Sequence, residues 1–491
     1  MAAVPKLSPD IPRALDRVIH DARRGLVHDL IGDEDLIAHL KEDPGRLKAL
    51  MADSYKPKRP MHVAVPKTSL TVRPTLRVDL AERALVQVLV ETFAVATLGD
   101  LPDWVCGWRF TQSPQSPDDL ADNNDEWKRY NTLLQTYEEN GPRFVLKTDI
   151  ANFFHHVPLS TLRDSLQIPS PVVKKTLLKF LETWSPAGVG LPQPMLASAL
   201  LANAYLRPLD AVLSSHEAVR WMDDVTVFCL SRSEAVGALV RIQDVLRRLN
   251  LGINRAKTSL TPPHRIDFSP PGFRLTASAW DAVEDPTELS AYPPIPPWDE
   301  VIRSDEVDRR VFGVYTRRLP HDPPDPFADQ IVSSLDRLPH VADHASRYLR
   351  DAPNQGRILR GVQDFLAGPD NQFVWQEYRL ATLFWHAPSL PARSLSFALK
   401  RAMDGNVFVP TRGVYLRALA KHGTADHVAT IEEMAAHEDH PAMLRCLMIA
   451  AAESGRVPWR RVKNIAGPEP RFTLLADYLK RRQCRVPDLS F

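Results

Sequence analysis

The chain has 491 residues, of which 44% are hydrophobic and 25% charged, as expected for a globular protein of two or three domains. Its 61 basic and 60 acidic residues give a net charge of +1, which excludes a bulk positive field, so any nucleic-acid surface must be a local basic channel. Four scattered cysteines lack metal-ligand spacing, and no apolar run approaches the roughly 20 residues of a membrane helix. We therefore expect a cytoplasmic protein with reduced, mostly buried thiols, no signal peptide and no membrane partner.

The N-terminal part of the sequence predicts amphipathic helices around a basic hairpin. Apolar residues recur at helical spacing over residues 10–55 and again over 80–98. Between them, residues 62–78 contain two short β-like runs around a polar turn, with Lys67 and Arg73 near its ends. Such a hairpin can present two cations to a polyanion such as a triphosphate, although basic residues in exposed hairpins are common.

An apolar strand over residues 143–149 ends in Asp149 and follows a polar, irregular segment at 100–142. An acid at the end of a core strand belongs to the rim of a sheet, where sites form. The chain then turns into a helix. The intervening pair His155 and His156 has no cysteine or carboxylate at ligand spacing, which disfavours a metal site there.

A turn at residues 188–194 opens a long predicted helix over 195–213 that is rich in small residues. Pro194 suits the first helical position, where its missing N–H removes no hydrogen bond. The small side chains permit either the close approach of a backbone or ligand, or simply tight helix packing.

The stretch 219–228 places two adjacent acids, Asp223 and Asp224, at the turn of a short β-hairpin. Neighbouring carboxylates repel each other, so such a turn is either solvated or neutralised by a cation. The sequence alone leaves both interpretations open.

After this hairpin, Ser233 can cap a helix that ends near residue 249, and a turn plus strand beyond it carries Lys257. The order β-α-α-β-β-α-β over residues 143–260 favours an antiparallel sheet with helices on one face.

Proline is dense between residues 261 and 325, which indicates a boundary or an extended crossing segment. Within it, residues 292–298 are interpreted either as a packed linker or as a polyproline ligand for another domain. From residue 326 onward, helical patterns recur with a loose period of roughly 30–45 residues, which favours a helical solenoid.

Six short motifs, in their order and approximate spacing, resemble the polymerase motifs of reverse transcriptases. They are Val65–Lys67 with Arg73, Gly107–Arg109, Lys147–Phe154, Gly190–Gln193 with Ser198 and Ala202–Leu206, Trp221–Asp224, and Leu251–Asn254 with Lys257. Each motif is weak alone, whereas six in the right order form a specific pattern.

The resemblance implies an α+β fold, with the fingers and palm of a right-hand polymerase followed by an all-α, HEAT-like helical-repeat domain. The palm would be an antiparallel sheet with helices. On this basis the chain divides into N-terminal helices and fingers (1–142), palm (143–262), Pro-rich connection (263–325) and α-helical repeat domain (326–491).

The resemblance also implies a two-metal site. Nucleotide addition is an in-line displacement at phosphorus that two divalent ions assist, and Mg²⁺ prefers carboxylate and phosphate oxygens. Asp149 and Asp223 would hold two Mg²⁺ ions, with Asp224 beside them as a further ligand.

Five more residues take roles from the family pattern. Lys67 and Arg73 would neutralise the triphosphate, and Gln193 would help position the incoming nucleotide. Phe154, at the place of the steric gate, would favour deoxynucleotides. Lys257 would be catalytic, protonating the leaving pyrophosphate.

Two positions depart from the family pattern: Trp221 replaces the usual tyrosine before the acid pair, and Pro194 replaces the usual glycine after Gln193. In the family both positions lie near the primer terminus or templating base. The departures therefore bear on what is copied and leave the metal chemistry intact.

A palm followed by Pro-rich sequence and helical repeats most resembles bacterial abortive-infection and defence-associated reverse transcriptases. This resemblance implies antiphage defence, dNTP substrates, a nucleic-acid partner (an RNA template or non-coding RNA, and a DNA product) and a homo-oligomer. Synthesis in that family can be non-templated, protein-primed or dependent on a non-coding RNA. The alternatives are a conventional RNA-templated reverse transcriptase of a mobile element, and a helical-repeat scaffold with an inactive polymerase half.

Overall fold

The computed structural model describes residues 11–23, 25–110, 120–262, 296–304, 306–321, 325–465 and 470–489. Contacts divide the chain into two compact units. The first contains the described residues of 1–24, 43–61 and 76–270, and the second contains those of 25–42, 62–75 and 271–491. Both units are discontinuous, whereas the four segments expected from the sequence are continuous. The proline-rich stretch 263–295, with most of the polyproline segment, lies outside the described residues.

The first unit begins with helices that pack on one long apolar helix. α3 (Leu80–Leu98) confirms the helix predicted over 80–98, and both α1 (Ile11–Arg23) and the 3₁₀ helix η1 (Pro44–Met51) contact it. α1 buries Leu15 and Val18 at helical spacing, which is the pattern that predicted it.

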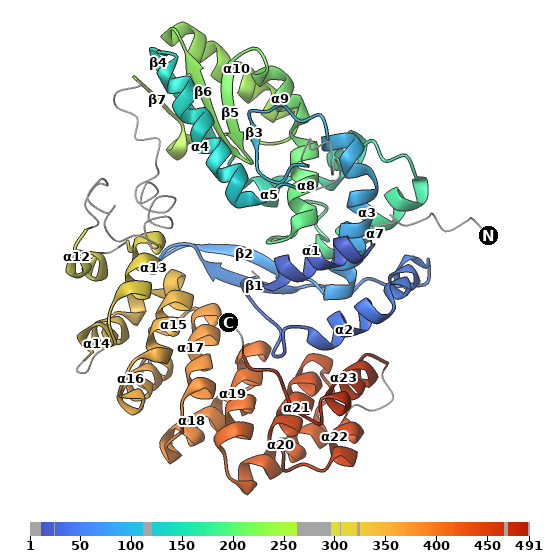
Figure 1. The fold of residues 1–491 in the computed structure, drawn as a ribbon, viewed down its shortest axis with the longest axis vertical. Helices are drawn as coiled ribbons and strands as arrows, with labels where there is room; N and C mark the ends of the chain where they lie inside the picture. Colours follow the sequence, from blue (N-terminus) through green and yellow to red (C-terminus); the bar gives the residue numbers. More distant parts are fainter. Residues whose placement is uncertain are drawn as a thin grey trace. The chain divides into compact units, whose positions relative to one another are not determined.

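One mixed sheet of five strands forms the centre of the first unit, in the order β3-β5-β6-β4-β7 (Figure 1). The strands are β3 (Val105–Cys106), β4 (Phe144–Asp149), β5 (Glu217–Trp221), β6 (Asp224–Cys229) and β7 (Ser259–Thr261). β3 pairs parallel with β5, and the other pairs are antiparallel. Because side chains alternate along a strand, Asp149, Asp224 and Trp221 share one face, and Arg220 lies on the other.

Helices cover both faces of this sheet, so the predicted single helical layer is wrong. α10 (Arg232–Arg248) contacts β4, β6 and α9 (Arg207–Leu213) on the face of Arg220. α4 (Asn123–Glu139) contacts β3 and β5 on the opposite face, within the segment expected to be irregular. Its side chains at helical spacing pack on the sheet: Tyr130, Leu133, Leu134 and Tyr137.

The connection between β4 and β5 holds more helices than predicted. They are α5 (Phe153–His156), α6 (Leu159–Ser165), α7 (Pro171–Trp184), α8 (Leu196–Tyr205) and α9. The single helix predicted over 195–213 is wrong, because the ring of Pro208 cannot continue a helix past the preceding turn. Pro194 also precedes the N-cap residue Met195, so it is not the first helical residue. Likewise Ser231, not Ser233, caps α10, accepting a hydrogen bond from the Glu234 N–H at 3.1 Å.

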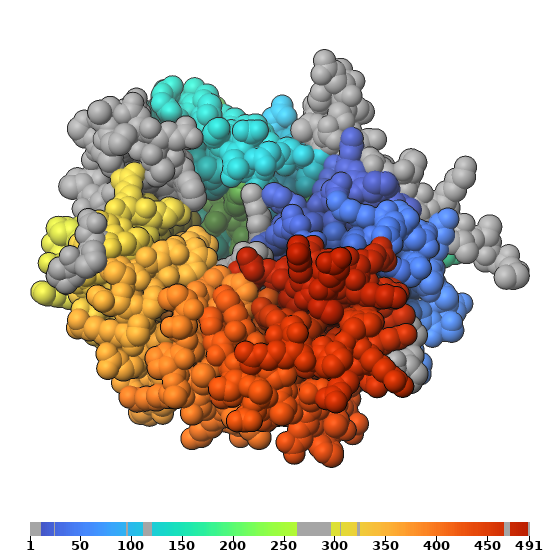
Figure 2. All heavy atoms as spheres, turned by 60° about the horizontal axis from the view of Figure 1, so that its bottom comes forward, coloured from blue at the N-terminus to red at the C-terminus, as the bar shows by residue number. Residues whose placement is uncertain are grey.

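The second unit is an array of helices in two rows. The odd-numbered helices from α13 to α21 contact one another in succession, and α14, α16 and α18 do so beside them. In Figure 2 the residues of this unit, coloured from yellow to red, follow one another in sequence order. The described helices are α12 (Trp298–Arg303), α13 (Arg309–Arg318), α14 (Pro326–Ser333), α15 (Ala342–Asp351), α16 (Gln355–Ala367), α17 (Val374–His386), α18 (Ala392–Met403), α19 (Val409–His422), α20 (Ala425–His437), α21 (Pro441–Glu453), α22 (Trp459–Ile465) and α23 (Pro470–Arg481). Helix formation thus begins before the predicted boundary at 326.

The N-terminal segment 25–42 belongs to this array and not to the first unit. Its helix α2 (Glu34–Glu42) contacts α23. Arg445 on α21 donates four hydrogen bonds, at 2.7–3.0 Å, to the carboxylates of Asp29 and Asp35. Residues more than 400 positions apart are therefore joined in one buried network.

A separate hairpin of β1 (Met61–Pro66) and β2 (Val72–Arg77) confirms the hairpin predicted from the sequence. Lys67 and Arg73 are exposed on it. Most of the hairpin, residues 62–75, belongs to the second unit.

All four cysteines are free thiols, and three of them are buried, as expected. Within the ranges that the structure describes, no helix is both long and apolar enough to cross a membrane.

Candidate active site

Two carboxylates face each other across neighbouring strands of the first unit. Asp149, the last residue of β4, is the direct cross-strand partner of Asp224, the first residue of β6. The hairpin predicted over 219–228 is confirmed: Met222 and Asp223 form the turn, and Met222 adopts a φ of +53°. The Ile150 N–H donates to the Asp223 carbonyl oxygen at 3.1 Å, which ties the turn to the end of β4.

Negative charges lie close together at this pair, because Asp223 adjoins Asp224 and Asp149 faces it. The Asp224 side chain keeps contact with solvent, yet protein surrounds it on most sides. This partial burial, followed by the charges of Asp223 and Asp149, raises the pKa of Asp224 to about 7, against the opposing effect of Lys257. Like charges directly opposite on two strands destabilise a sheet, so this cluster is not explained by fold stability.

The segment after α10 surrounds Asp149 with hydrogen-bond donors. Asn254 donates from its backbone N–H to the Asp149 carbonyl oxygen at 2.7 Å and from its side chain to Oδ1 at 3.0 Å. The Ala151 N–H donates to the Gly252 carbonyl oxygen at 2.8 Å, which fixes the two segments side by side. Asp149 is consequently buried, 4% exposed, and held in one orientation.

Lys257, from the 3₁₀ turn Arg255–Lys257, completes this environment. Its ammonium nitrogen lies 2.5 Å from Asp149 Oδ2, and its side chain remains half exposed. Partial burial alone would lower the pKa of Lys257, but the hydrogen bond with Asp149 and the charges of Asp224 and Asp223 outweigh it and raise that pKa. The structure therefore brings together the predicted residues Asp149, Asp224 and Lys257.

Below the hairpin, a buried arginine that sequence reasoning missed supports the turn. Arg220 is fully buried and forms a bidentate ion pair with Asp210 at 2.7 and 2.8 Å. It also donates to the Met222 carbonyl oxygen at 3.0 Å and to Asn203 Oδ1 at 3.1 Å. A signal was available, because an arginine at an inward-facing position of an apolar strand needs a buried acid.

Trp221 is held by an aromatic cluster on the face of the carboxylates. Its ring centroid lies 4.9 Å from that of Trp127, 5.6 Å from Trp108 and 5.8 Å from Tyr130. Gly107, with a φ of +80°, lies so close that a Cβ there would be 3.3 Å from the indole. The motif Gly107–Arg109 thus packs against the residue that replaces the family's tyrosine.

The loop of the Gly190–Gln193 motif is fastened to the helix that carries Phe154. The Leu191 N–H donates to the Phe154 carbonyl oxygen at 2.7 Å, and the Gly190 N–H donates to the Val157 carbonyl oxygen at 2.8 Å. Gly190 adopts a φ of +104°, and a Cβ there would lie 3.4 Å from a backbone oxygen of α5. Phe154 itself is half-buried, 5.3 Å from Phe153 between ring centroids.

The other predicted nucleotide-binding residues are distributed over both units. Gln193 is half-buried in the first unit, where its carbonyl oxygen accepts a hydrogen bond from the Leu76 N–H at 2.9 Å. Lys67 and Arg73 belong to the second unit. The structure therefore groups Phe154 and Gln193 with the loop beside α5, and it does not assign the two hairpin cations to the carboxylates.

Among the described residues, no group of three or more His, Cys, Asp or Glu side chains is positioned together as a metal site. The donor chemistry nevertheless fits Mg²⁺, since Asp149, Asp223 and Asp224 supply only carboxylate oxygens. The cross-strand pairing of Asp149 with Asp224 favours a cation here, because a bound cation would offset both the burial and the neighbouring charges that raise the pKa of Asp224.

Comparison with protein families identifies residues 65–271 as a match to the family described as reverse transcriptase (RNA-dependent DNA polymerase). A comparison with curated proteins finds no match. The matched region covers less than half of the chain and contains the sheet, the acid pair and Lys257. It indicates an RNA-directed DNA polymerase, a nucleotidyltransferase, with nucleic acid and dNTPs as substrates.

Proposed function

We propose that the reverse-transcriptase domain at residues 65–271 adds deoxynucleotides at Asp149, Asp223 and Asp224, and that the chain acts in antiphage defence. The single observation that carries the polymerase site is the direct cross-strand pairing of Asp149 with Asp224 beside the Asp223 turn. Three acids at this point serve no packing purpose, and partial burial together with the charges of Asp223 and Asp149 raises the pKa of Asp224.

Two Mg²⁺ ions would be held by Asp149, Asp223 and Asp224. When bound, the ions supply charge neutralisation for the attacking hydroxyl and the leaving phosphates. The chain's own part is to fix these ligands: Asn254 orients Asp149, and Arg220 holds the Met222 carbonyl of the turn.

The remaining site residues act on the nucleotide. Lys257, with its raised pKa, keeps a proton available for the leaving pyrophosphate. Phe154 crowds a ribose 2′-hydroxyl, and Gln193 orients the base. Lys67 and Arg73, exposed on their hairpin, neutralise the triphosphate.

The defence role rests on the combination of this domain with the helical array of the second unit, whose HEAT-like character we propose from its two rows of helices. The array stands where a thumb would follow in the chain, and Trp221 is locked in an aromatic cluster. Both features favour a non-templated, protein-primed or non-coding-RNA-dependent reaction in a cytoplasmic homo-oligomer. A conventional RNA-templated reverse transcriptase is the second candidate, favoured by the family match itself.

The test is incorporation of labelled dNTPs by the purified full chain with Mg²⁺, with and without a primed RNA template. Label retained on the protein without template supports protein-primed synthesis, whereas incorporation only on primed RNA supports the second candidate. Asp223→Ala should reduce incorporation by about 100–10,000-fold, and the exposed Asp164→Ala is the matched control. Incorporation that survives Asp223→Ala would exclude this site, and equal phage plating on cells with and without the gene would exclude defence.

A further inference from the structure

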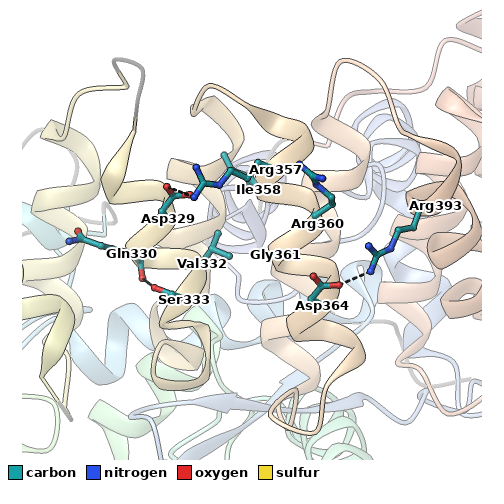
Figure 3. A pocket seen from close by; sticks show the side chains of 10 residues that line it. All are labelled: Asp329, Gln330, Val332, Ser333, Arg357, Ile358, Arg360, Gly361, Asp364 and Arg393. Carbon is teal, nitrogen blue, oxygen red and sulfur yellow. Dashed lines mark hydrogen bonds and ion pairs between the residues drawn. The ribbon is translucent and has the colours of Figure 1, made fainter.

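Exposed ion pairs line the open groove of the second unit, which has a volume of about 690 Å³ and lies along α14, α16 and the start of α18 (Figure 3). Arg357 pairs with Asp329 at 3.1 Å, and Arg393 pairs with Asp364 at 2.8 Å. All four side chains are 43–67% exposed, and exposed pairs contribute little to stability or to a fixed geometry. A polar side chain that fixes the backbone is more effective when it is buried, and the first unit contains one, Asn203.

Asn203, on α8, is fully buried, and both ends of its amide are bound. Its nitrogen donates to the carbonyl oxygens of Gly107 and Trp108, both at 3.1 Å. Its oxygen accepts from Arg220 Nη1 at 3.1 Å. These partners also fix which way the amide points, because a carbonyl oxygen can only accept and a guanidinium can only donate. Asn203 therefore joins the loop after β3 to the buried arginine of β5.

The two backbone turns joined in this way both contain left-handed residues. Gly107 and Trp108 have φ values of +80° and +48°, and Met222 has a φ of +53°. A residue other than glycine is uncommon in this region and stays there only where its surroundings hold it. Asn203 holds the Trp108 carbonyl, and Arg220 holds the Met222 carbonyl at 3.0 Å. One buried pair of side chains thus holds both turns.

The loop held by Asn203 determines where the Trp221 ring lies. The ring centroids of Trp108 and Trp221 are 5.6 Å apart, and a Cβ on Gly107 would lie 3.3 Å from the indole of Trp221. Trp221 is the direct cross-strand partner of Asp224, so both side chains lie on the same face of the sheet, and the indole is only half-buried. A nucleic-acid strand that reaches Asp224 therefore passes beside this ring.

We propose that Asn203 is a positioning residue for nucleic-acid binding: it holds the Gly107–Trp108 loop and, through it, the Trp221 ring beside the carboxylates. Arg220 has the complementary task of holding the turn that carries Asp223. Only the identity of the ligand rests on the proposed function, because the contacts themselves do not. Stacking of bases on aromatic rings strengthens single-strand binding without sequence preference, so loss of the ring's position should weaken binding and leave the chemical step intact.

Asn203→Leu tests this proposal, since leucine has nearly the same shape and removes every hydrogen bond of the amide. Arg220 keeps Asp210 and the Met222 carbonyl in this variant. The dissociation constants of fluorescein-labelled single-stranded DNA and RNA, measured by anisotropy with the full chain, should rise about 10-fold. The rate of dNTP incorporation at saturating nucleic acid should stay within about threefold of wild type, whereas Arg220→Met should lower it at any nucleic-acid concentration.

A spectroscopic measurement separates this role from a general loosening of the fold. The difference in near-UV circular dichroism between wild type and Trp221→Phe isolates the contribution of the packed indole, and Asn203→Leu should lose most of that contribution. Gln376→Leu is the matched control in the second unit, where a buried amide donates to the Leu335 carbonyl oxygen at 2.6 Å. This control should lose stability while keeping both the Trp221 signal and the affinity for nucleic acid.

Trp108→Leu is a second variant, which removes the ring that packs on Trp221 but keeps the backbone bonds of Asn203, so no buried hydrogen bond is lost. It should weaken binding to the same degree as Asn203→Leu. Wild-type affinity in either folded variant overturns the proposal, and so does an equal loss in Gln376→Leu. A loss of saturating rate as large as in Arg220→Met would overturn it too, by showing that Asn203 acts through the turn.

The exposed groove supplies the baseline, because Arg357→Ala should change none of these quantities. If the wild-type chain incorporates no dNTP, the proposed function fails, yet the affinity and the Trp221 signal still decide the role of Asn203. A wild-type chain that binds neither DNA nor RNA overturns that role.

Discussion

Arginines paired with buried carboxylates organise both units, but they connect residues at different distances along the chain. In the first unit, Arg220 binds Asp210, only 10 residues earlier, and supports the turn of the hairpin two residues later. In the second unit, Arg445 binds Asp29 and Asp35, more than 400 residues earlier. Both networks satisfy a guanidinium with carboxylates out of bulk water.

The difference lies in what each network determines. Arg220 fixes the backbone of the hairpin turn that carries Asp223, because it donates to the carbonyl oxygen of the adjacent Met222. Arg445 holds segment 25–42 in place, and that segment contains none of the proposed site residues. Loss of the first should therefore affect both stability and activity, whereas loss of the second should affect stability alone.

Arg220→Met should have the largest effect. Removing one partner of a buried ion pair typically costs about 3–5 kcal/mol of unfolding free energy, because the other charge stays buried. Urea unfolding measures this loss, and dNTP incorporation below the unfolding transition should also decrease sharply. The double variant Arg220→Met/Asp210→Leu should recover part of the stability but none of the activity, since the Met222 carbonyl still lacks its donor. Recovery of activity in the double variant would contradict a positioning role.

Arg445→Met should reduce stability by about 3 kcal/mol, somewhat less than Arg220→Met, because the Arg445 side chain is 20% exposed. Incorporation by the folded protein should stay near wild type. Arg481→Met is the control in the same region: its ion pair with Glu42 is exposed, and surface pairs contribute little. A comparable loss of stability in both variants would show that the pairs of Arg445 with Asp29 and Asp35 stabilise the protein no more than an exposed ion pair does.

Gly413→Ala tests the contact between α19 and the N-terminal segment. A Cβ at this position would lie 2.6 Å from Leu30 Cδ1 and 2.8 Å from Cys446 Sγ. Overpacking of this kind costs about 1–3 kcal/mol, measurable by urea unfolding. Gly356→Ala, where a Cβ meets no atom within 4 Å, should lose nothing. If both variants keep wild-type stability, the segment does not pack on α19 this closely.

His344→Gln should have the smallest effect, visible only as a change in pH dependence. Burial lowers the pKa of His344 to about 4 from its ordinary value of 6.5, with Asp343 opposing this and Arg309, Arg347 and Arg317 adding to it. As the pH falls through 6.5, the unfolded chain binds a proton that the folded chain excludes until about pH 4, so stability decreases. Between pH 7 and 5 this amounts to about 1–2 kcal/mol, and the variant should lose that much less than wild type.

His386 offers a parallel test, since burial lowers its pKa to about 4 as well. His386→Gln should reduce the pH dependence by a similar amount, and the two substitutions should add. A pH dependence that neither variant changes would exclude both histidines as its source.

Local patterns predicted elements of both units. The helix over 80–98, the basic hairpin and the hairpin at Asp223 and Asp224 all follow from spacing along a few residues. α4 was missed because Leu134 is its one buried leucine facing the sheet, and the other contacts come from partly buried tyrosines and Leu133 within a strongly polar segment. Ser231 was the better cap in sequence, because Glu234 stands three residues after it as in a capping box, and this signal was missed.

Long-range partners could not be predicted in this way. Nothing within residues 25–42 indicates that Asp29 and Asp35 meet an arginine on α21, because each acid has an ordinary solvated interpretation. The site shows the same limit, because the Asp149–Asp224 pair follows only from the strand register. An arginine within an apolar strand pointed to Arg220, but the sequence did not identify Asp210 as its partner.

The interleaving of the two units has a consequence for synthesis on the ribosome. Asp29 and Arg445 are separated by 416 residues. At translation rates of about 5–20 residues per second, Asp29 emerges roughly 20–80 s before its partner exists. During that time the apolar face of segment 25–42 lacks its native partner, so a chaperone or transient non-native contacts must cover it. In a fragment that ends after the polymerase domain, segment 25–42 would never meet its partners on α21 and α23. A truncation designed to be soluble should therefore also lack segment 25–42.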